Sequence, residues 1–307
     1  MTSDKLFCDI DFFENYKKIE HDHSFVPTRK GQTLLYPLTG CGTIDRIHWW
    51  SEFYVGCTHN CKYCFVCIEA LKYNVIKNKS EWKNARLKYP IGKIFDIFKE
   101  EMQKVIPGET ILHSMTADPF MYNHDESRKI HLKVSKIINK EGIINRFLTK
   151  GVYHKINDLD KNLNQFGSSI TNLKEKNRRI LEPFAAPQKD RISSLHKMSK
   201  RGYFTFINIT CFPFNSSLKD IDRLLDKISF VDEISFHGLY YFGHPTDEEF
   251  DYYYNISSRI FEFAHQKDKS FYTTGLINPY IRSVLKKEKF IPYPLTNKSI
   301  SIPRGIL

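Results

Sequence analysis

The residues best suited to chemistry are three cysteines that stand close together, Cys57, Cys61 and Cys64, with Tyr63 directly before the last. Their spacing is C-x3-C-x2-C. Three thiolates in so short a loop can bind three irons of a [4Fe–4S] cubane and leave the fourth iron without a protein ligand. An open iron can chelate the amino and carboxylate groups of a small amino acid and pass one electron into its sulfonium. The spacing therefore predicts a redox-active iron–sulfur centre.

A structural zinc site is the alternative for these cysteines. Zinc commonly takes four thiolates, and Cys67 stands three residues beyond Cys64. Such sites normally use two separated cysteine pairs, however, and no second C-x2-C pair follows. We expect Cys67 to lie on the following helix as a small buried residue. The chain has seven cysteines, of which Cys8, Cys41 and Cys211 stand alone, so a disulfide framework is not indicated.

The elements that must position this loop alternate between strands and helices. Apolar, β-rich runs occur at 45–55, 110–115, 144–149, 168–171, 204–212, 233–237 and 270–275. Amphipathic stretches occur at 91–105, 126–140, 159–165, 188–200, 218–229 and 247–265. This alternation predicts right-handed βαβ units and a parallel sheet. About six units are too few for a closed eight-fold barrel, so we expect an α/β fold, a partial (β/α)6 TIM-like barrel of parallel strands that is open on one side.

The partial barrel is expected to span residues 45–275, with an N-terminal extension (1–44) packing on it and a C-terminal extension (276–307). Asp125, Ser217 and Thr246 are typical helix-start residues for the helices that follow them. In a β/α barrel the reactive groups lie in loops after the C-terminal ends of the strands. The polar residues that follow each apolar run are therefore the candidates for a site.

Charge and composition constrain the partners and the location. The formal net charge is +11. A nucleic-acid partner would explain this charge, but so would an AT-rich coding sequence that enriches Lys, Asn, Ile, Phe and Tyr. The first twenty residues have no basic segment followed by an apolar run, so they do not form a signal peptide. No run of eighteen apolar residues is present, so we expect no membrane span and a cytoplasmic protein.

Two further side chains are candidates at the predicted strand ends. Cys211 follows the fifth strand and could donate a hydrogen atom to a radical, although a buried structural cysteine is the favoured reading. His237 ends the sixth strand and could serve as an acid, a base or a substrate contact. A hydrogen-bonded structural histidine explains it as well.

The cysteine spacing, the aromatic Tyr63 and the place after a first strand resemble the radical S-adenosylmethionine (SAM) superfamily. The resemblance implies a [4Fe–4S] cluster on Cys57, Cys61 and Cys64, with SAM bound to the open iron. It also implies reductive cleavage of SAM to methionine and a 5′-deoxyadenosyl radical that abstracts hydrogen from a substrate. Tyr63 would lie beside the adenine. A flavodoxin- or ferredoxin-type protein would supply the electron.

Residues 47–240 are similar to the spore photoproduct lyase-related branch of this superfamily. The similarity rests on S-M-T-A-D-P-F from Ser114, F-L-T-K ending at Lys150, S-I-T from Ser169, and an E-P-x-x-x-P-x-x-x-R block from Glu182 to Arg191. Carried over by position, Ser114, Thr116, Lys150 and Ser169 would contact the methionine end or the ribose of SAM. Taken singly, a serine at a strand end is usually a turn residue.

One position departs from the lyase pattern. The lyases place a hydrogen-donating cysteine on strand two, and here Met115 holds that place. Methionine has no S–H to donate, so we do not expect the lyase reaction by the lyase's own route. The leading prediction is radical SAM chemistry on a nucleic acid or nucleotide, in repair or base modification. Radical SAM chemistry on a peptide or small metabolite is one alternative, and a non-catalytic zinc- or cluster-bearing nucleic-acid-binding protein is another.

Overall fold

The fold is known from a computed structural model that describes residues 33–38, 47–72, 74–156, 159–171, 174–210, 217–237, 247–274 and 300–302. A nine-stranded sheet forms its centre. In spatial order its strands are β1 (Leu35–Pro37), β2 (Trp49–Ser51), β5 (Thr110–His113), β6 (Ile144–Thr149), β7 (Asn164–Ile170), β8 (Phe204–Thr210), β9 (Glu233–His237), β10 (Ser270–Thr274) and β11 (Ile300–Ile302).

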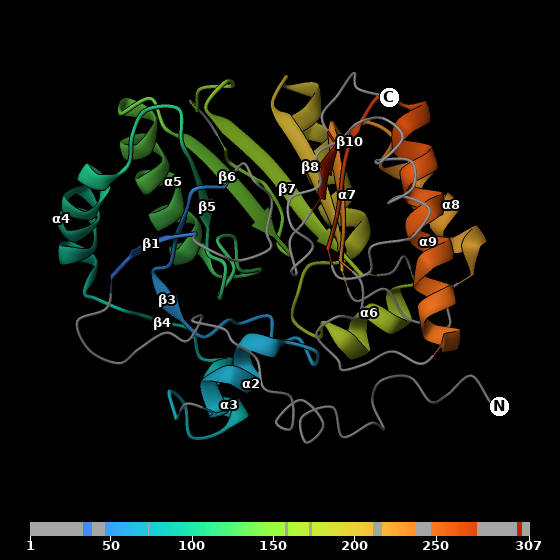
Figure 1. The fold of residues 1–307 in the computed structure, drawn as a ribbon. Helices are drawn as coiled ribbons and strands as arrows, with labels where there is room; N and C mark the ends of the chain where they lie inside the picture. The colour runs from blue at the N-terminus through green and yellow to red at the C-terminus, as the bar shows by residue number, and fades with distance from the viewer. Residues whose placement is uncertain are drawn as a thin grey trace.

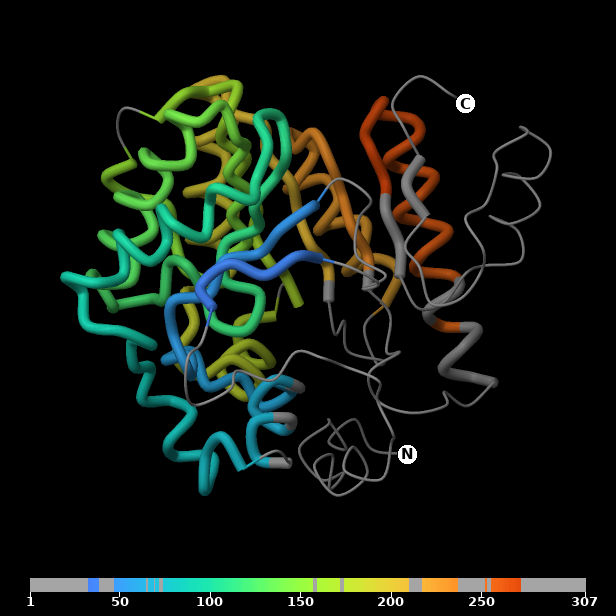
Figure 2. Tube along the Cα trace, turned by 60° about the vertical axis from the view of Figure 1, so that its left-hand side comes forward, coloured from blue at the N-terminus to red at the C-terminus, as the bar shows by residue number. Residues whose placement is uncertain are grey.

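Within this sheet, the strands β2, β5, β6, β7, β8, β9 and β10 run parallel to one another. The edge strands β1 and β11 pair antiparallel with β2 and β10, and the sheet is not closed. The predicted partial barrel of parallel strands is therefore confirmed. β1 belongs to the segment predicted as an N-terminal extension, and Figure 2 shows it with β2 in front of the other strands.

The helices follow the strands along the chain. They are α2 (Phe65–Lys72), α3 (Lys79–Trp82), α4 (Ile91–Glu101) with the 3-10 turn η1 (Met102–Lys104), α5 (Asp125–Lys140), α6 (Glu175–Leu181), α7 (Gln188–Lys200), α8 (Leu218–Lys227) and α9 (Asp247–Gln266). α4 and α5 cover one flank of the sheet, and α8 and α9 cover the other (Figure 1). α2, α3 and α6 gather at the end of the sheet toward which β6 and β7 point. A short two-stranded antiparallel sheet of β3 (Tyr54–Val55) and β4 (Arg86–Leu87) lies with them.

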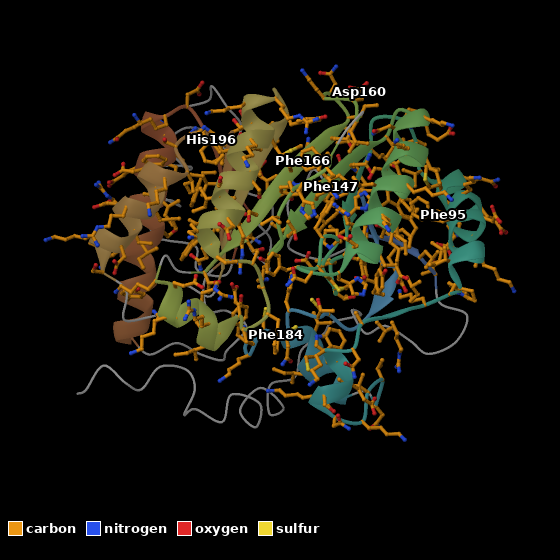
Figure 3. The ribbon with its side chains drawn as sticks, turned by 180° about the vertical axis from the view of Figure 1, so that it is seen from behind. Phe95, Phe147, Asp160, Phe166, Phe184 and His196 are labelled. Carbon is orange, nitrogen blue, oxygen red and sulfur yellow. The ribbon has the colours of Figure 1, made fainter. Side chains whose placement is uncertain are left out.

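The main core lies between the sheet and the helices. Phe147 of β6 and Phe166 of β7 stack with ring centroids 5.3 Å apart, and Leu195 of α7 and Leu224 of α8 are buried in the same cluster (Figure 3). The strand residues between them face the other side of the sheet, which is the inner face of the partial barrel. On this inner face, Arg146 bonds to Gln165 and Glu233 and lies over the Phe206 ring. Period-two alternation of this kind is what fixes one face of each strand against the helices.

Helix starts agree with the sequence in one case and differ by a residue in another. Ser217 caps α8 through a full capping box with Asp220, as the sequence predicts. The cap of α5 is His124, whose side chain accepts from the Ser127 N–H, and Asp125 is the first helical residue. Asp125 still stabilises the helix there, because a carboxylate in the first turn complements the helix dipole. Thr246 lies outside the described residues.

Two predicted elements were wrong. The run at 45–55 is not one strand, because β2 ends at Ser51 and β3 begins at Tyr54, with Glu52 N–H donating to the Leu34 carbonyl between them. The stretch at 159–165 is not a helix: its last two residues begin β7. Its carbonyls are used elsewhere, since Leu159 accepts from the Tyr203 hydroxyl and Leu163 from the Asn145 N–H.

No helix in the described part of the chain is both long and apolar enough to cross a lipid bilayer.

Candidate functional site

The cysteine loop follows β3 and lies at the C-terminal end of the parallel strands, beside α2 and α6 (Figure 1). Gly56 opens it with a φ of 91°, and a Cβ there would stand 2.4 Å from the Trp82 carbonyl oxygen. Cys57 N–H donates to that same carbonyl at 2.8 Å. On the other side, Lys62 N–H donates to the Leu181 carbonyl at 2.9 Å. The ends of α3 and α6 therefore hold the loop from both sides.

The three predicted ligand thiols are free, partly buried and close enough to influence one another. Burial raises the pKa of each, and for Cys57 the neighbouring Asp118, Cys61 and Cys64 raise it further. Surroundings that disfavour isolated thiolates suit a site where positive metal supplies the missing charge. The sulfur donors and their grouping fit an iron–sulfur cluster. Among the described side chains, no group of three or more His, Cys, Asp or Glu has the arrangement needed to hold a single metal ion.

A histidine inside the loop fixes it to the next loop of the barrel. His59 is buried, its Nε2 accepts from the Tyr122 N–H at 2.8 Å, and its Nδ1 lies 3.4 Å from Asp118 Oδ2. Because Nε2 accepts, Nδ1 carries the proton and faces the carboxylate. Burial alone would raise the pKa of Asp118, but His59, the Lys150 N–H and the Thr149 hydroxyl lower it to about 2. Asp118 therefore stays ionised and joins the cysteine loop to the ends of β5 and β6.

A second buried carboxylate organises the opposite side of the loop. Glu182 accepts from the Tyr63 hydroxyl, from Thr171 Oγ1 at 2.6 Å and from Arg191 Nη2 at 2.5 Å. Burial would raise the pKa of Glu182, yet Arg191 and Lys150 hold it at about 2. The Glu182 to Arg191 block, which carried part of the resemblance, thus forms one buried ion pair. It orients Tyr63, the residue predicted to lie beside the adenine.

Lys150, directly after β6, is a second cation close to these groups. Its Nζ lies 5.8 Å from the centre of the Tyr63 ring. Burial would lower the pKa of Lys150, but the charges of Cys61, Glu182 and Asp118 raise it. No carboxylate of the described residues lies within ion-pair distance of Nζ. Lys150 is therefore a charged group beside the cysteine loop with capacity to bind an anionic ligand group.

Ser114 has a partner outside the cysteine loop. It has a φ of 55°, and its hydroxyl lies 3.1 Å from His131 Nε2 on α5. His131 Nδ1 meets His113 Nδ1 at 3.0 Å, and His113 Nε2 meets Asn145 Oδ1 at 2.7 Å. The Asn145 amide N–H donates to the Ser135 carbonyl, so Asn145 Oδ1 accepts from His113 Nε2–H. His113 Nδ1 then accepts from His131 Nδ1–H, and His131 Nε2 is left as an acceptor. Ser114 is then the donor to His131.

Thr116 and Ser169 also have protein partners. Thr116 donates its N–H, at 2.7 Å, and its hydroxyl to Glu52 Oε2, a fully buried carboxylate that follows β2. The carbonyl of Ser169 accepts from Arg191 Nη1 at 3.0 Å. All three predicted SAM contacts therefore lie at strand ends on the same edge of the sheet as the cysteines. Their contact with SAM stays a prediction.

Other sulfur residues and the predicted acid or base are placed as follows. Cys67 lies on α2, buried beside Cys57 and Cys64, and burial raises its pKa to about 12. Met115 is half-buried and packs against the Trp50 cluster on the inner face. Cys211 lies outside the described residues, and only the backbone of His237, at the end of β9, is described. The structure therefore leaves both proposed catalytic residues as predictions.

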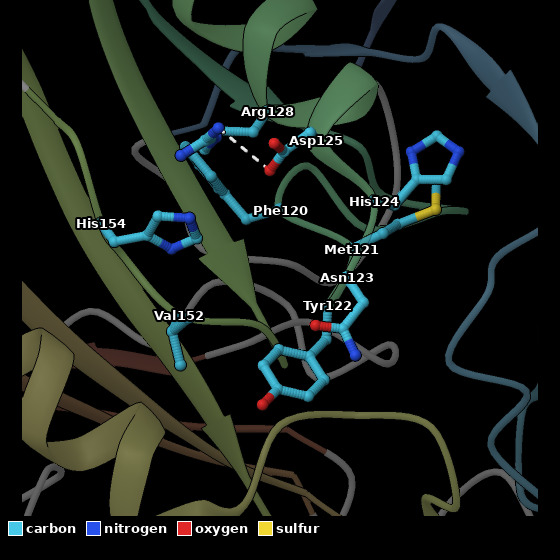
Figure 4. Close-up of a pocket in the computed structure, with 9 residues that line it drawn as sticks. All are labelled: Phe120, Met121, Tyr122, Asn123, His124, Asp125, Arg128, Val152 and His154. Atoms are coloured by element: carbon cyan, nitrogen blue, oxygen red, sulfur yellow. Dashed lines mark hydrogen bonds and ion pairs between the residues drawn. The ribbon is translucent and has the colours of Figure 1, made fainter.

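A small pocket of about 110 Å³ adjoins the same edge (Figure 4). His154, Arg128 and Tyr122 are among its lining residues, and Asp125 pairs with Arg128 at 3.0 Å. The N–H of Tyr122, a lining residue, donates to His59 of the cysteine loop, so the pocket adjoins this loop.

Sequence reasoning missed His59, Glu52 and Trp82. A buried histidine within C-x3-C gave no signal apart from its place in the loop. Glu52 could have been noticed as an acidic residue directly after an apolar run. Trp82 is twenty-five residues beyond Cys57 in a segment without strong periodicity, and only the folded chain brings it to the loop.

Comparison with known proteins gives a family and a set of similar structures. The model of the radical SAM superfamily matches residues 51–228. A double mutant of spore photoproduct lyase with bound AdoMet and dinucleoside spore photoproduct is 16% identical, with a TM-score of 0.47, over 71% of this chain and 62% of that chain. Streptococcus suis SuiB bound to precursor peptide SuiA is 14% identical, with a TM-score of 0.48, over 75% of this chain and 49% of that chain. The chain thus spans less than two thirds of these relatives. No curated protein matches it.

Proposed function

The chain belongs to the radical SAM superfamily, and from this premise we propose an enzyme that cleaves SAM reductively at a [4Fe–4S] cluster held by Cys57, Cys61 and Cys64. The [4Fe–4S] cluster and SAM are the cofactors of this superfamily. When bound, they supply a carbon radical that takes hydrogen from a substrate. The observation that carries the residue assignment is the grouping of three free thiols in one loop beside Lys150.

The chain's own residues have distinct parts in this proposal. Lys150 binds the carboxylate end of SAM, because it is charged and has no carboxylate partner among the described residues. Tyr63, held by Glu182, borders the adenine. Ser114, Thr116 and Ser169 complete the contacts with SAM, as the resemblance implies. An external protein of flavodoxin or ferredoxin type supplies one electron at a time.

A nucleic acid or nucleotide is the proposed substrate class. The support is the group of exposed cations beside the cysteine loop: Lys62 lies in the loop itself, and Lys176 and Arg179 lie on α6, whose last carbonyl binds Lys62 N–H. Lys176 stands in the first turn of α6, where the helix dipole disfavours a cation. The position of Lys176 is therefore better explained by contact with an external anion, such as a phosphate, than by a contribution to the stability of α6.

Anaerobic reconstitution of the whole chain tests the reaction. We expect about four irons with equivalent sulfide per chain, and formation of 5′-deoxyadenosine from SAM when a one-electron reductant is added. One zinc per chain without sulfide would contradict the proposal and favour a non-catalytic binding protein. Single-stranded oligonucleotides and short peptides, compared as stimulants of SAM cleavage, test the substrate class. Stimulation by peptide alone would overturn the nucleic-acid assignment.

A further inference from the structure

Trp82, the last residue of α3, is in contact with the cysteine loop through both its backbone and its side chain. It is 1% exposed and packs in one cluster with Cys57, Cys64 and Cys67. Its carbonyl accepts from the Cys57 N–H at 2.8 Å. Because a Cβ at Gly56 would clash with that carbonyl, the backbone of Trp82 and the start of the loop are in the closest approach that glycine permits.

The indole N–H of Trp82 is buried and closes no hydrogen bond with any described residue. An unsatisfied buried donor is costly to the fold, so a tryptophan whose buried N–H is unpaired needs a compensating partner. Phenylalanine would fill a similar space without the polar atom. The acceptor that the indole N–H influences is the sulfur of Cys64: burial raises the pKa of this thiol, while the N–H groups of Cys67 and Val66 and the indole of Trp82 lower it.

Several N–H groups lie close to the sulfur of Cys64. Backbone N–H groups at the start of α2 and one side-chain N–H all favour its ionised form. For Cys57, the donor in this role is the N–H of His59. A neutral thiol is a weak acceptor, whereas a thiolate is a strong one. The buried indole N–H of Trp82, which packs with Cys64 and has no acceptor among the described residues, is therefore a donor for the Cys64 sulfur when that sulfur binds iron.

We propose that Trp82 is a positioning residue that donates its indole N–H to the Cys64 sulfur and thereby raises the reduction potential of the bound cluster. Hydrogen bonds to the sulfurs of an iron–sulfur cluster are among the factors that set its potential. A donor stabilises the more negative, reduced state more than the oxidised state, because the attraction grows with the charge on sulfur. Outer partners of metal ligands commonly tune a site in this manner. This inference rests on the assignment of Cys64 as a cluster ligand.

The test is the midpoint potential of the reconstituted holoenzyme, followed by electron paramagnetic resonance during a redox titration. Trp82→Phe removes the N–H and keeps an aromatic ring, so the potential is expected to become more negative while the iron content stays at the wild-type level. Trp50→Phe is the matched control, since Trp50 is a buried tryptophan of the inner face away from the cysteine loop. A Trp82→Phe potential equal to that of the wild type would overturn the proposal.

A second measurement covers the case in which Trp82→Phe does not assemble a cluster. Wild-type holoenzyme with ¹⁵N-labelled indole nitrogens is examined by pulsed electron paramagnetic resonance in the reduced state. We expect a nitrogen coupling from one indole, and its absence would contradict the hydrogen bond. The proposed function fails differently: the wild-type chain would then assemble no iron–sulfur cluster and give no reduced-cluster signal for either measurement.

Discussion

The three clustered cysteines lie where an uncharged sulfur is favoured until metal arrives, because burial raises the pKa of each thiol. We predict that replacement of Cys57, Cys61 or Cys64 by alanine abolishes both the iron content and the cleavage of SAM. Replacement of Cys67, a buried residue of α2, should leave the iron content near the wild-type value. Iron and sulfide analysis after reconstitution decides this. Loss of iron in Cys67→Ala with retention in Cys57→Ala would reverse the ligand assignment.

Lys150 gives a second prediction at this scale. Its ammonium lies near Tyr63, and burial is outweighed by the charges of Cys61, Glu182 and Asp118, which raise its pKa. If it pairs with the carboxylate of SAM, Lys150→Ala should weaken SAM binding by roughly tenfold or more, since a charge-assisted contact is worth more than about 1.4 kcal/mol. The iron content should not change. Calorimetric titration with SAM measures this, and Lys155→Ala, an exposed cation five residues on, is the control. Equal affinity in both variants would contradict a contact between Lys150 and SAM.

The chemistry of single residues was predictable only where several of them form a pattern. The cysteine spacing indicated a cluster, and the block from Glu182 to Arg191 carried a resemblance. Only the folded structure shows that Glu182 and Arg191 of this block form a buried ion pair and that Glu182 orients Tyr63. His59 and Glu52 gave no such pattern, because their partners Asp118 and Thr116 are 59 and 64 residues away in the sequence.

The start of the cysteine loop at Gly56 depends on its contact with the end of α3. Gly56 and Gly108 have nearly the same left-handed φ, 91° and 88°, but only Gly56 has a backbone atom where a Cβ would be. Gly108→Ala should cost about 1 kcal/mol of folding free energy from the backbone conformation alone. Gly56→Ala should in addition displace the Trp82 carbonyl and impair cluster assembly. Chemical denaturation and iron content measure the two effects. Equal loss of iron in both variants would contradict a specific role for the contact.

The packing of α5 on β5 should depend on pH. Burial lowers the pKa of His113 to about 4, and burial with the neighbouring His113 lowers that of His131 further. Their usual value is 6.5, so below it the unfolded chain binds more protons than the folded chain. The contribution of these histidines to stability is therefore complete above pH 6.5, and stability should fall by about 2 kcal/mol for each histidine toward pH 5. Denaturant unfolding of the apoprotein tests this, and His113→Gln should flatten the dependence. An unchanged slope in that variant would contradict it.

The succession of elements was largely predictable, and its errors have a common cause. β6, α7 and β9 coincide with the predicted ranges because period-two or helical patterns extend over their whole length. The stretch at 159–165 has helix-compatible residues, but tertiary hydrogen bonds to Leu159 and Leu163 override local preference. α6 was not expected, since its charged residues Glu175, Arg178 and Arg179 form no apolar face.

For the whole molecule, the formal net charge is +11. One part has a structural explanation, since Lys99, Lys140, Lys200 and Lys227 lie in the last turns of their helices, where cations complement the dipole. Of the cations near the cysteine loop, Arg179 also lies in the last turn of its helix, α6, but Lys62 and Lys176 have no such explanation. Phe184, 56% exposed, follows the last residue of α6 by three positions and lies at the end of the molecule opposite Asp160 (Figure 3). Exposed aromatic and basic side chains together are typical of single-stranded nucleic-acid binding.

A pair of charge reversals separates this interpretation from charge that merely follows codon usage. The first double variant, Lys176→Glu with Arg179→Glu, changes the surface beside the cysteine loop, where Arg179 is 74% exposed. The control, Lys140→Glu with Lys227→Glu, changes the net charge by the same amount at the C-termini of α5 and α8. If nucleic acid binds at the loop, the first pair should weaken affinity for a single-stranded oligonucleotide by about tenfold or more and reduce its salt dependence, because counterion release falls with each lost phosphate contact. The second pair should have a much smaller effect. Fluorescence anisotropy between low and moderate salt measures both. Equal losses in the two double variants would show attraction by net charge alone and would leave the nucleic-acid assignment without its structural support.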